Sequence, residues 1–117
     1  MAPMSEPQLF AGIPVADYKA SSAWYERLFG GPPDFRPHDT EAVWRASERG
    51  WVYVVADPGR AGHALVTVLV DDLDAHLAEI AERGIAAPAI ETIPNAARKA
   101  TFVDPDGNAI TFGETAG

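Results

Sequence analysis

The sequence is poor in cysteine and histidine, two residue types that often act as nucleophiles, general acids or bases, or metal ligands. The chain has 117 residues, no cysteine and three histidines, which are His38, His63 and His76. We expect His38 in an exposed loop and His76 on a helix beside apolar residues. His63, near the middle of the chain, is the histidine that we would test as a general acid or base. The residue order contains no serine triad, cysteine pair or glycine-rich phosphate loop.

Three cationic side chains could orient a ligand. Arg98 and Lys99 enter a strand predicted near the C-terminus, and Arg45 lies in a related strand of the first half. A guanidinium at the rim of a cavity can bind a carboxylate or phenolate through paired hydrogen bonds. The alternative is a solvated group or a surface ion pair, because the chain has 17 Asp and Glu residues.

Composition excludes several classes of partner. A chain of 117 residues with 47% hydrophobic residues can bury the core of one domain without a disulfide or metal. Its net charge of −8 disfavours nucleic acid and anionic membranes. No apolar run approaches the ~20 residues of a membrane span, and residues 1–8 lack the basic and apolar segments of a signal peptide. We therefore predict a cytoplasmic protein with no nucleic-acid or membrane partner.

Hydrophobic periodicity predicts strands of period two and helices of period 3.6. The expected helices cover 18–29, after Asp17, and 73–83, after Asp72. The expected strands are 9–15, 34–36, 42–46, 51–56, 64–70, 89–93, 99–103 and 109–112. We expect a flexible N-terminus at 1–7, a single domain over 8–113 and a tail at 114–117. Within the domain, module one covers 8–57, a linker covers 58–62 and module two covers 63–113.

The order of strand, helix and three strands occurs twice. The two helix-starting aspartates, Asp17 and Asp72, are 55 residues apart, and the same offset superposes Ile13 on Val68. We interpret the halves as versions of one unit. Coincidence is the alternative, since this order of elements is common.

Three motifs then carry a resemblance to a known family. The first is Val15-Ala16-Asp17 with the helix end at 24–30, the second is the segment 70–74 with Arg83-Gly84, and the third is the run 102–110 around Asp104-Pro105-Asp106-Gly107-Asn108. Together they resemble the vicinal oxygen chelate superfamily. Glyoxalases, bleomycin-resistance proteins and extradiol dioxygenases belong to it. The resemblance implies an α+β fold in which two βαβββ modules form a cupped mixed sheet around a central cavity, usually within a homodimer. We interpret 104–108 as a turn, because the rest of a calcium-binding loop is missing.

The resemblance also gives the positions at which active members hold a divalent metal. These positions are Phe10, Leu65 and Thr111 in this sequence. A phenyl ring and an isobutyl group have no donor atoms, and one hydroxyl is too weak alone. We therefore predict no metal and no cofactor. A strand register shifted by two residues would bring His63 inward, without a companion donor.

An apolar cavity without a metal is typical of a small-molecule binding site. The predicted ligand-binding residues are Phe10, Trp44, Trp51, Tyr53, Leu65, Thr67, Arg98 and Thr111. We predict a metal-independent protein that binds or sequesters an aromatic or apolar ligand. One alternative is an enzyme (lyase, isomerase or dioxygenase) with displaced metal ligands, or with metal-free catalysis by His63, Arg98 or Tyr53. Another is an interaction subunit whose cavity is filled by side chains.

Overall fold

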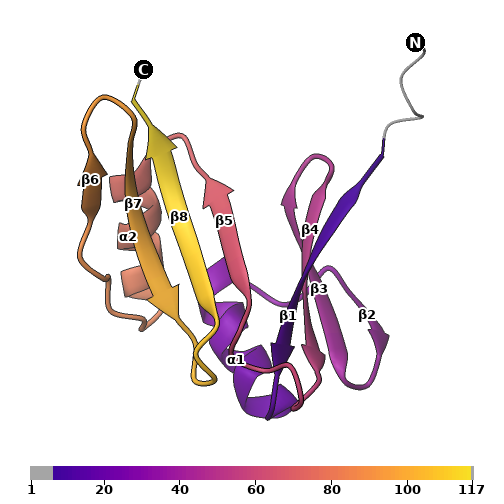
Figure 1. Ribbon diagram of the computed structural model, residues 1–117. Helices are drawn as coiled ribbons and strands as arrows, with labels where there is room; N and C mark the ends of the chain where they lie inside the picture. Colours follow the sequence, from indigo (N-terminus) through magenta and orange to yellow (C-terminus); the bar gives the residue numbers. More distant parts are fainter. Residues whose placement is uncertain (1–6, 117) are drawn as a thin grey trace.

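The computed structural model describes residues 7–116, which form two four-stranded sheets and two helices (Figure 1). The elements are β1 (Leu9–Val15), α1 (Tyr18–Phe29), β2 (Phe35–His38), β3 (Glu41–Ser47), β4 (Gly50–Ala56), β5 (Leu65–Leu69), α2 (Leu73–Glu82), β6 (Glu91–Ile93), β7 (Ala97–Val103) and β8 (Ala109–Thr115). None of the helices in this part of the chain is long and apolar enough to span a membrane.

The two sheets have the same topology. Sheet A has the strand order β1-β4-β3-β2 and sheet B the order β5-β8-β7-β6. In each sheet the first and last strands of the module pair in parallel, and the remaining pairs are antiparallel. The predicted α+β class and the two βαβββ modules are therefore confirmed.

Both helices begin in the same way. The Asp17 carboxylate accepts a hydrogen bond from the Ala20 amide at 3.1 Å, and the Asp72 carboxylate accepts one from the Ala75 amide at 3.0 Å. Each aspartate satisfies an amide that the first helical turn leaves free. The two helix starts, 55 residues apart, are therefore equivalent in the two modules.

A single hydrophobic core lies between the sheets. One face of sheet A packs on α1 and one face of sheet B packs on α2, and the buried side chains of both modules form one cluster. We call these sides the helix faces and the opposite sides the outward faces. Because the helix faces share one core, the two outward faces of a chain point away from each other.

The turn at 104–108 of module two forms hydrogen bonds with module one. The buried Asp104 carboxylate accepts hydrogen bonds from the Tyr25 hydroxyl of α1 at 2.7 Å and from the Asn108 side-chain amide at 2.8 Å. The same Asn108 amide donates to the Pro14 carbonyl of β1 at 2.8 Å. We call Tyr25, Asp104 and Asn108 the inter-module latch. A segment predicted only as a turn therefore also fixes module two against module one.

The strand boundaries differ from the predictions at the C-terminus. β8 continues to Thr115, which pairs with Ala97, and Arg98 pairs with Glu114. Glu114 and Thr115 of the predicted tail at 114–117 therefore belong to a strand, because antiparallel pairing with β7 satisfies their backbone groups. Most of the predicted flexible N-terminus, at 1–6, lies outside the described residues.

Candidate functional site

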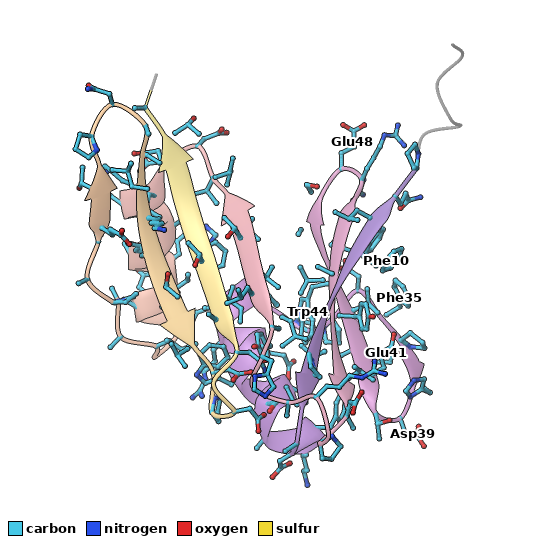
Figure 2. The ribbon with its side chains drawn as sticks, in the orientation of Figure 1. Phe10, Phe35, Asp39, Glu41, Trp44 and Glu48 are labelled. Carbon is cyan, nitrogen blue, oxygen red and sulfur yellow. The ribbon has the colours of Figure 1, made fainter. Side chains whose placement is uncertain are left out.

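The eight residues predicted to bind a ligand lie on both faces of the sheets. Phe10, Trp51 and Tyr53 lie on the outward face of sheet A, as strand register requires. Leu65, Thr67 and Thr111 lie on the outward face of sheet B. The remaining two, Trp44 and Arg98, lie on the helix faces. Figure 2 shows Phe10 and Phe35 on the side of sheet A that points away from sheet B, and Trp44 on the side toward it.

The outward face of sheet A carries an ordered group of aromatic rings, which we call the aromatic face: Phe10, Phe35, Trp51 and Tyr53. Register places Phe10 beside Trp51, and their rings stack with centroids 5.8 Å apart and planes 10° apart. Phe35 contacts Trp51 edge to face, also at 5.8 Å. Phe10 and Phe35 are nonetheless 48% and 44% exposed. Flat ring surface is therefore held in place and open to a ligand.

Polar contacts immobilise the central ring of the aromatic face. The Trp51 indole N–H donates to the Gln8 side chain at 2.6 Å. The Arg45 guanidinium lies 5.7 Å from the Trp51 ring centroid and donates to the backbone carbonyls of Ser47 and Glu48. Trp51 is therefore oriented before any ligand arrives, which reduces the entropy cost of binding.

Gly12 makes room for the Tyr53 side chain. A Cβ atom at position 12 would lie 2.6 Å from both Cζ and the hydroxyl oxygen of Tyr53. The Tyr53 ring therefore crosses the neighbouring strand directly above Gly12. The space that the missing side chain of Gly12 leaves is therefore filled by this tyrosine.

The outward face of sheet B is mostly aliphatic with a row of hydroxyl groups. Leu65 and Leu69 are 87% and 63% exposed. Between them, Thr67 of β5 pairs in register with Thr111 of β8, and Thr111 pairs with Thr101 of β7. The Thr101 and Thr111 hydroxyls are 2.8 Å apart and form a hydrogen bond.

Trp44 and Arg98 have structural contacts on the helix faces. Trp44 is only 5% exposed, and its indole N–H donates to the Gly31 carbonyl at 2.9 Å. Arg98 forms ion pairs with Asp74 at 3.0 Å and Glu114 at 3.3 Å, and its hydrogen bond holds the pKa of the Asp74 carboxyl below its usual range. In the register of β3 and β4, Trp44 pairs with Val52, which is the neighbour of Trp51 along β4. The two tryptophans therefore lie on opposite faces of sheet A.

The three histidines have different surroundings. His38 is exposed and lies 3.1 Å from the Glu41 carboxylate, and His63 is exposed before β5. His76 is half-buried, with its ring centroid 4.4 Å from that of Phe112. Its Nε2 atom is buried without a hydrogen-bond partner, and burial lowers the pKa of the imidazole.

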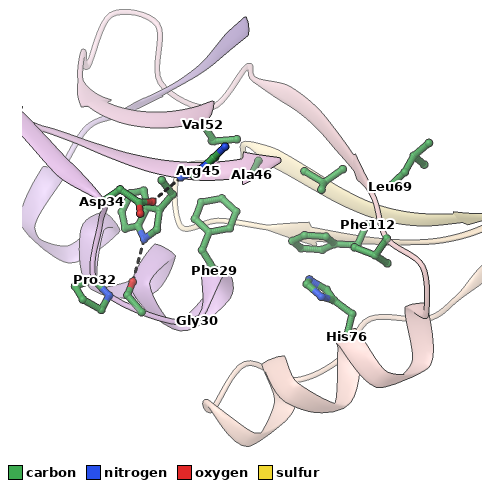
Figure 3. Close-up of a pocket in the computed structure, with 14 residues that line it drawn as sticks. Phe29, Gly30, Pro32, Asp34, Arg45, Ala46, Val52, Leu69, His76 and Phe112 are labelled. Atoms are coloured by element: carbon green, nitrogen blue, oxygen red, sulfur yellow. Dashed lines mark hydrogen bonds between the residues drawn. The ribbon is translucent and has the colours of Figure 1, made fainter. Parts of the chain in front are cut away.

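A cavity of about 290 Å³ lies between the modules on their helix faces (Figure 3). Phe29 and Trp44 form its module-one wall, and Val68, His76 and Phe112 form its module-two wall. A second hollow of about 330 Å³ shares Ala46, Val52, Val68 and Leu69 with it and reaches Leu9 of β1. Of the predicted ligand residues, Trp44 lines the first space, and Trp51 and Thr67 line the second.

Comparison with protein families identifies the superfamily of this chain. The model of the glyoxalase/bleomycin resistance protein/dioxygenase superfamily matches residues 8–112. The chain belongs to this superfamily. The predicted resemblance is therefore confirmed. No curated protein matches the chain.

Alignments with solved structures cover almost the whole chain. A glyoxalase/bleomycin resistance protein from Catenulispora acidiphila DSM 44928 is 49% identical, with a TM-score of 0.89 and an alignment that covers 94% of this chain and 99% of the other. TnmS3, an antibiotic binding protein from Streptomyces sp. CB03234, is 25% identical, with a TM-score of 0.72 and coverage of 99% and 100%. A bleomycin-binding protein complexed with bleomycin is 22% identical, with a TM-score of 0.72 and coverage of 97% and 100%, and shows the shared fold.

The side chains at the metal positions of the superfamily do not fit a metal ion here. The Phe10 ring stacks on Trp51, Leu65 is aliphatic, and Thr111 bonds to Thr101. Residues 7–116 contain no cluster of three His, Asp or Glu side chains that could hold an ion. A divalent metal needs several converging oxygen or nitrogen donors. No step of a reaction can therefore be assigned to a metal from these residues.

Two features of the site were missed at the sequence level. Neither Phe35 nor Thr101 is among the residues that the sequence predicts to bind a ligand. Phe35 reaches Trp51 because β2 pairs with β3 through Val43, and Thr101 reaches Thr111 because β7 pairs with β8. Strand register is the signal that would have found both residues.

Proposed function

We propose that this protein binds and sequesters a planar aromatic or apolar small molecule without a metal ion. The binding site combines the aromatic face of one chain with the outward face of sheet B from a second copy. The observation that carries the proposal is the preordered aromatic face, in which Phe10 and Phe35 flank Trp51 and remain about half exposed. Exposed, ordered aromatic surface of this kind is typical of binding sites.

The fold supports a homodimer as the functional unit. The two outward faces of one chain point apart, so neither can cover the other. β1 and β5 are edge strands, and Leu65 and Leu69 project beside the β5 edge with most of their surface exposed. A twofold arrangement would place each aromatic face opposite the partner's sheet B face and close both sites together.

The relatives support binding rather than a particular reaction. TnmS3 is an antibiotic binding protein and is 25% identical over nearly the whole of both chains. The ligand of this chain is accordingly a drug-like molecule, held by stacking on Trp51. Since the metal positions hold Phe10, Leu65 and Thr111, binding proceeds without an ion.

The first test is a thermal-shift screen of water-soluble aromatic compounds, followed by calorimetric titration of any compound that raises Tm. Trp51→Ala should weaken binding by about tenfold or more, because it removes the central stacking ring. Trp24→Phe, on α1 and away from both outward faces, is the matched control and should leave the affinity unchanged.

Two further measurements separate the parts of the proposal. Titration in excess chelator should give the same affinity as titration without it, and native mass spectrometry should record a dimer. Loss of binding in chelator would overturn metal independence. Equal binding by Trp51→Ala and the unaltered protein would overturn the location of the site.

A further inference from the structure

The three threonines on the outward face of sheet B form a continuous row across three strands. Register joins Thr67 of β5 to Thr111 of β8 and Thr111 to Thr101 of β7. Thr67 and Thr101 are exposed, and Thr111 is partly exposed. We call these residues the threonine row. It presents three hydroxyl groups along one line of the face.

The threonine row keeps hydrogen-bonding capacity after its internal bond is made. A hydroxyl donates one hydrogen bond and accepts up to two. The 2.8 Å bond between Thr101 and Thr111 uses one hydrogen and one lone pair. The other hydroxyl hydrogen of this pair, the remaining lone pairs and the Thr67 hydroxyl stay available to a ligand.

The residues beside the threonine row are mostly apolar, as in a surface that binds another molecule. On one side lie Leu65, Ala109 and Val103, and on the other Leu69, Gly113 and Lys99. None of the outward-facing residues of β5 (Leu65, Thr67, Leu69) or of β8 up to Gly113 (Ala109, Thr111, Gly113) is charged, although 22% of the chain is charged. Leu65 and Val103 remain 87% and 61% exposed in the single chain. Apolar exposure without charge marks an interaction surface rather than a solvated one.

The charge beside the threonine row is already compensated. The Lys99 ammonium lies 3.7 Å from the Glu91 carboxylate on the adjacent strand β6. A ligand next to this pair meets no uncompensated positive charge. The face therefore suits a neutral oxygen-bearing group better than a carboxylate.

We propose that the threonine row is the hydrogen-bonding wall of the ligand site and selects neutral, oxygenated planar aromatics with hydroxyl or carbonyl groups along one edge. This inference rests on the proposed function, because the aromatic face of the second copy holds the ring. A hydrocarbon would cover the hydroxyls without offering them partners. That mismatch costs binding energy, whereas an oxygenated edge satisfies them.

The test uses a matched pair of probes, naphthalene and 2,3-dihydroxynaphthalene, each titrated by calorimetry below its solubility limit. The unaltered protein should prefer the diol by about tenfold or more, the effect of one or two net hydrogen bonds. The triple variant Thr67→Val, Thr101→Val, Thr111→Val keeps the side-chain shape and should lose this preference. Its affinity for naphthalene should rise, because stacking is retained and the hydroxyls that naphthalene leaves unpaired are removed.

The outcomes distinguish this inference from the proposed function. Equal binding of both probes by the unaltered protein, or an undiminished preference in the triple variant, overturns the role of the threonine row and leaves the binding function intact. Binding of neither probe overturns the proposed function for planar aromatics. Thr67→Val alone, at the edge strand β5, provides a second variant that keeps the Thr101–Thr111 bond and should lower the preference by about threefold.

Discussion

The contact between the two modules, which we call the seam, differs from the outward faces of the sheets. The seam buries polar groups, whereas the outward faces expose apolar ones. In the seam, the buried Asp104 carboxylate accepts four hydrogen bonds, from the Tyr25 hydroxyl, the Asn108 side chain and the amides of Asp106 and Asn108. On the outward faces, Phe10 and Leu65 leave large apolar surfaces uncovered. The chain therefore fixes its own modules with a saturated polar network and leaves apolar surface for other molecules.

The physical reason lies in the cost of leaving polar groups unpaired. Burial raises the pKa of Tyr25, and the hydrogen bond to Asp104 raises it further, so the phenol remains a donor. A buried network is stable only when each member has a partner. Among the described residues, the buried side-chain atoms without a partner are Ser22 Oγ and His76 Nε2, and neither belongs to the inter-module latch.

The largest expected effect follows from removing the centre of the inter-module latch. Asp104→Ala leaves the Tyr25 hydroxyl and the Asn108 side chain without their acceptor, so the free energy of unfolding should fall by about 3 kcal/mol or more. Urea denaturation measures the change. Asp71→Ala, which removes an exposed carboxylate, is the matched control and should cost less than about 0.5 kcal/mol. Equal effects of the two changes would contradict the contrast between seam and surface.

A smaller effect is expected from removing one donor of the inter-module latch. Tyr25→Phe deletes the hydroxyl but keeps the ring that packs against Trp24 and Phe29. Asp104 then keeps its other three hydrogen bonds, and the free energy of unfolding should fall by about 1–2 kcal/mol. An unchanged urea midpoint would show that water replaces the phenol in the seam.

Acid should destabilise the protein through His76. Burial lowers the pKa of this imidazole below its usual value of 6.5; Glu79 opposes the shift, and Arg83 adds to it. The unfolded chain therefore binds a proton at a higher pH than the native protein, so stability falls as the pH drops from about 6.5 through the lower native pKa. His76→Phe should flatten this part of the stability curve, measured by thermal unfolding from pH 7.5 down to pH 5. An identical pH dependence in the variant would assign the effect to other groups.

The smallest effect on the single chain is expected on the outward faces. Leu65→Ser changes a side chain that is 87% exposed, so the unfolding free energy of the dilute protein should change by less than about 0.5 kcal/mol. If Leu65 lies in a dimer interface, Tm of the unaltered protein rises with concentration and Tm of the variant rises less. Parallel concentration dependence in the two proteins would remove Leu65 from the interface.

Sequence periodicity predicted the fold well because local groups decide the elements. Asp17 and Asp72 each supply an acceptor for a helix start, and Gly30 adopts the left-handed conformation that ends α1. These signals lie within a few residues of the structure they cause. The end of β8 was placed too early, because its pairing with Ala97 and Arg98 depends on a separate strand.

The candidate site was predictable only in part. Strand alternation places Leu65 and Thr67 on one face, since neighbours two apart share a face. It could not decide that Trp44 packs in the core while Trp51 faces outward, because both lie on strands with alternating patterns. The register between β3 and β4 makes that choice.

The sequence by itself determined the repeated βαβββ order, the helix starts and the lack of metal donors at Phe10 and Leu65. These properties depend on residue types and short spacings. Only the tertiary structure decided that the helix faces share one core and that the aromatic face and the threonine row point apart. Packing of α1 against α2 and the hydrogen bonds of the inter-module latch set this arrangement, and they join residues up to 94 positions apart, beyond the reach of local pattern.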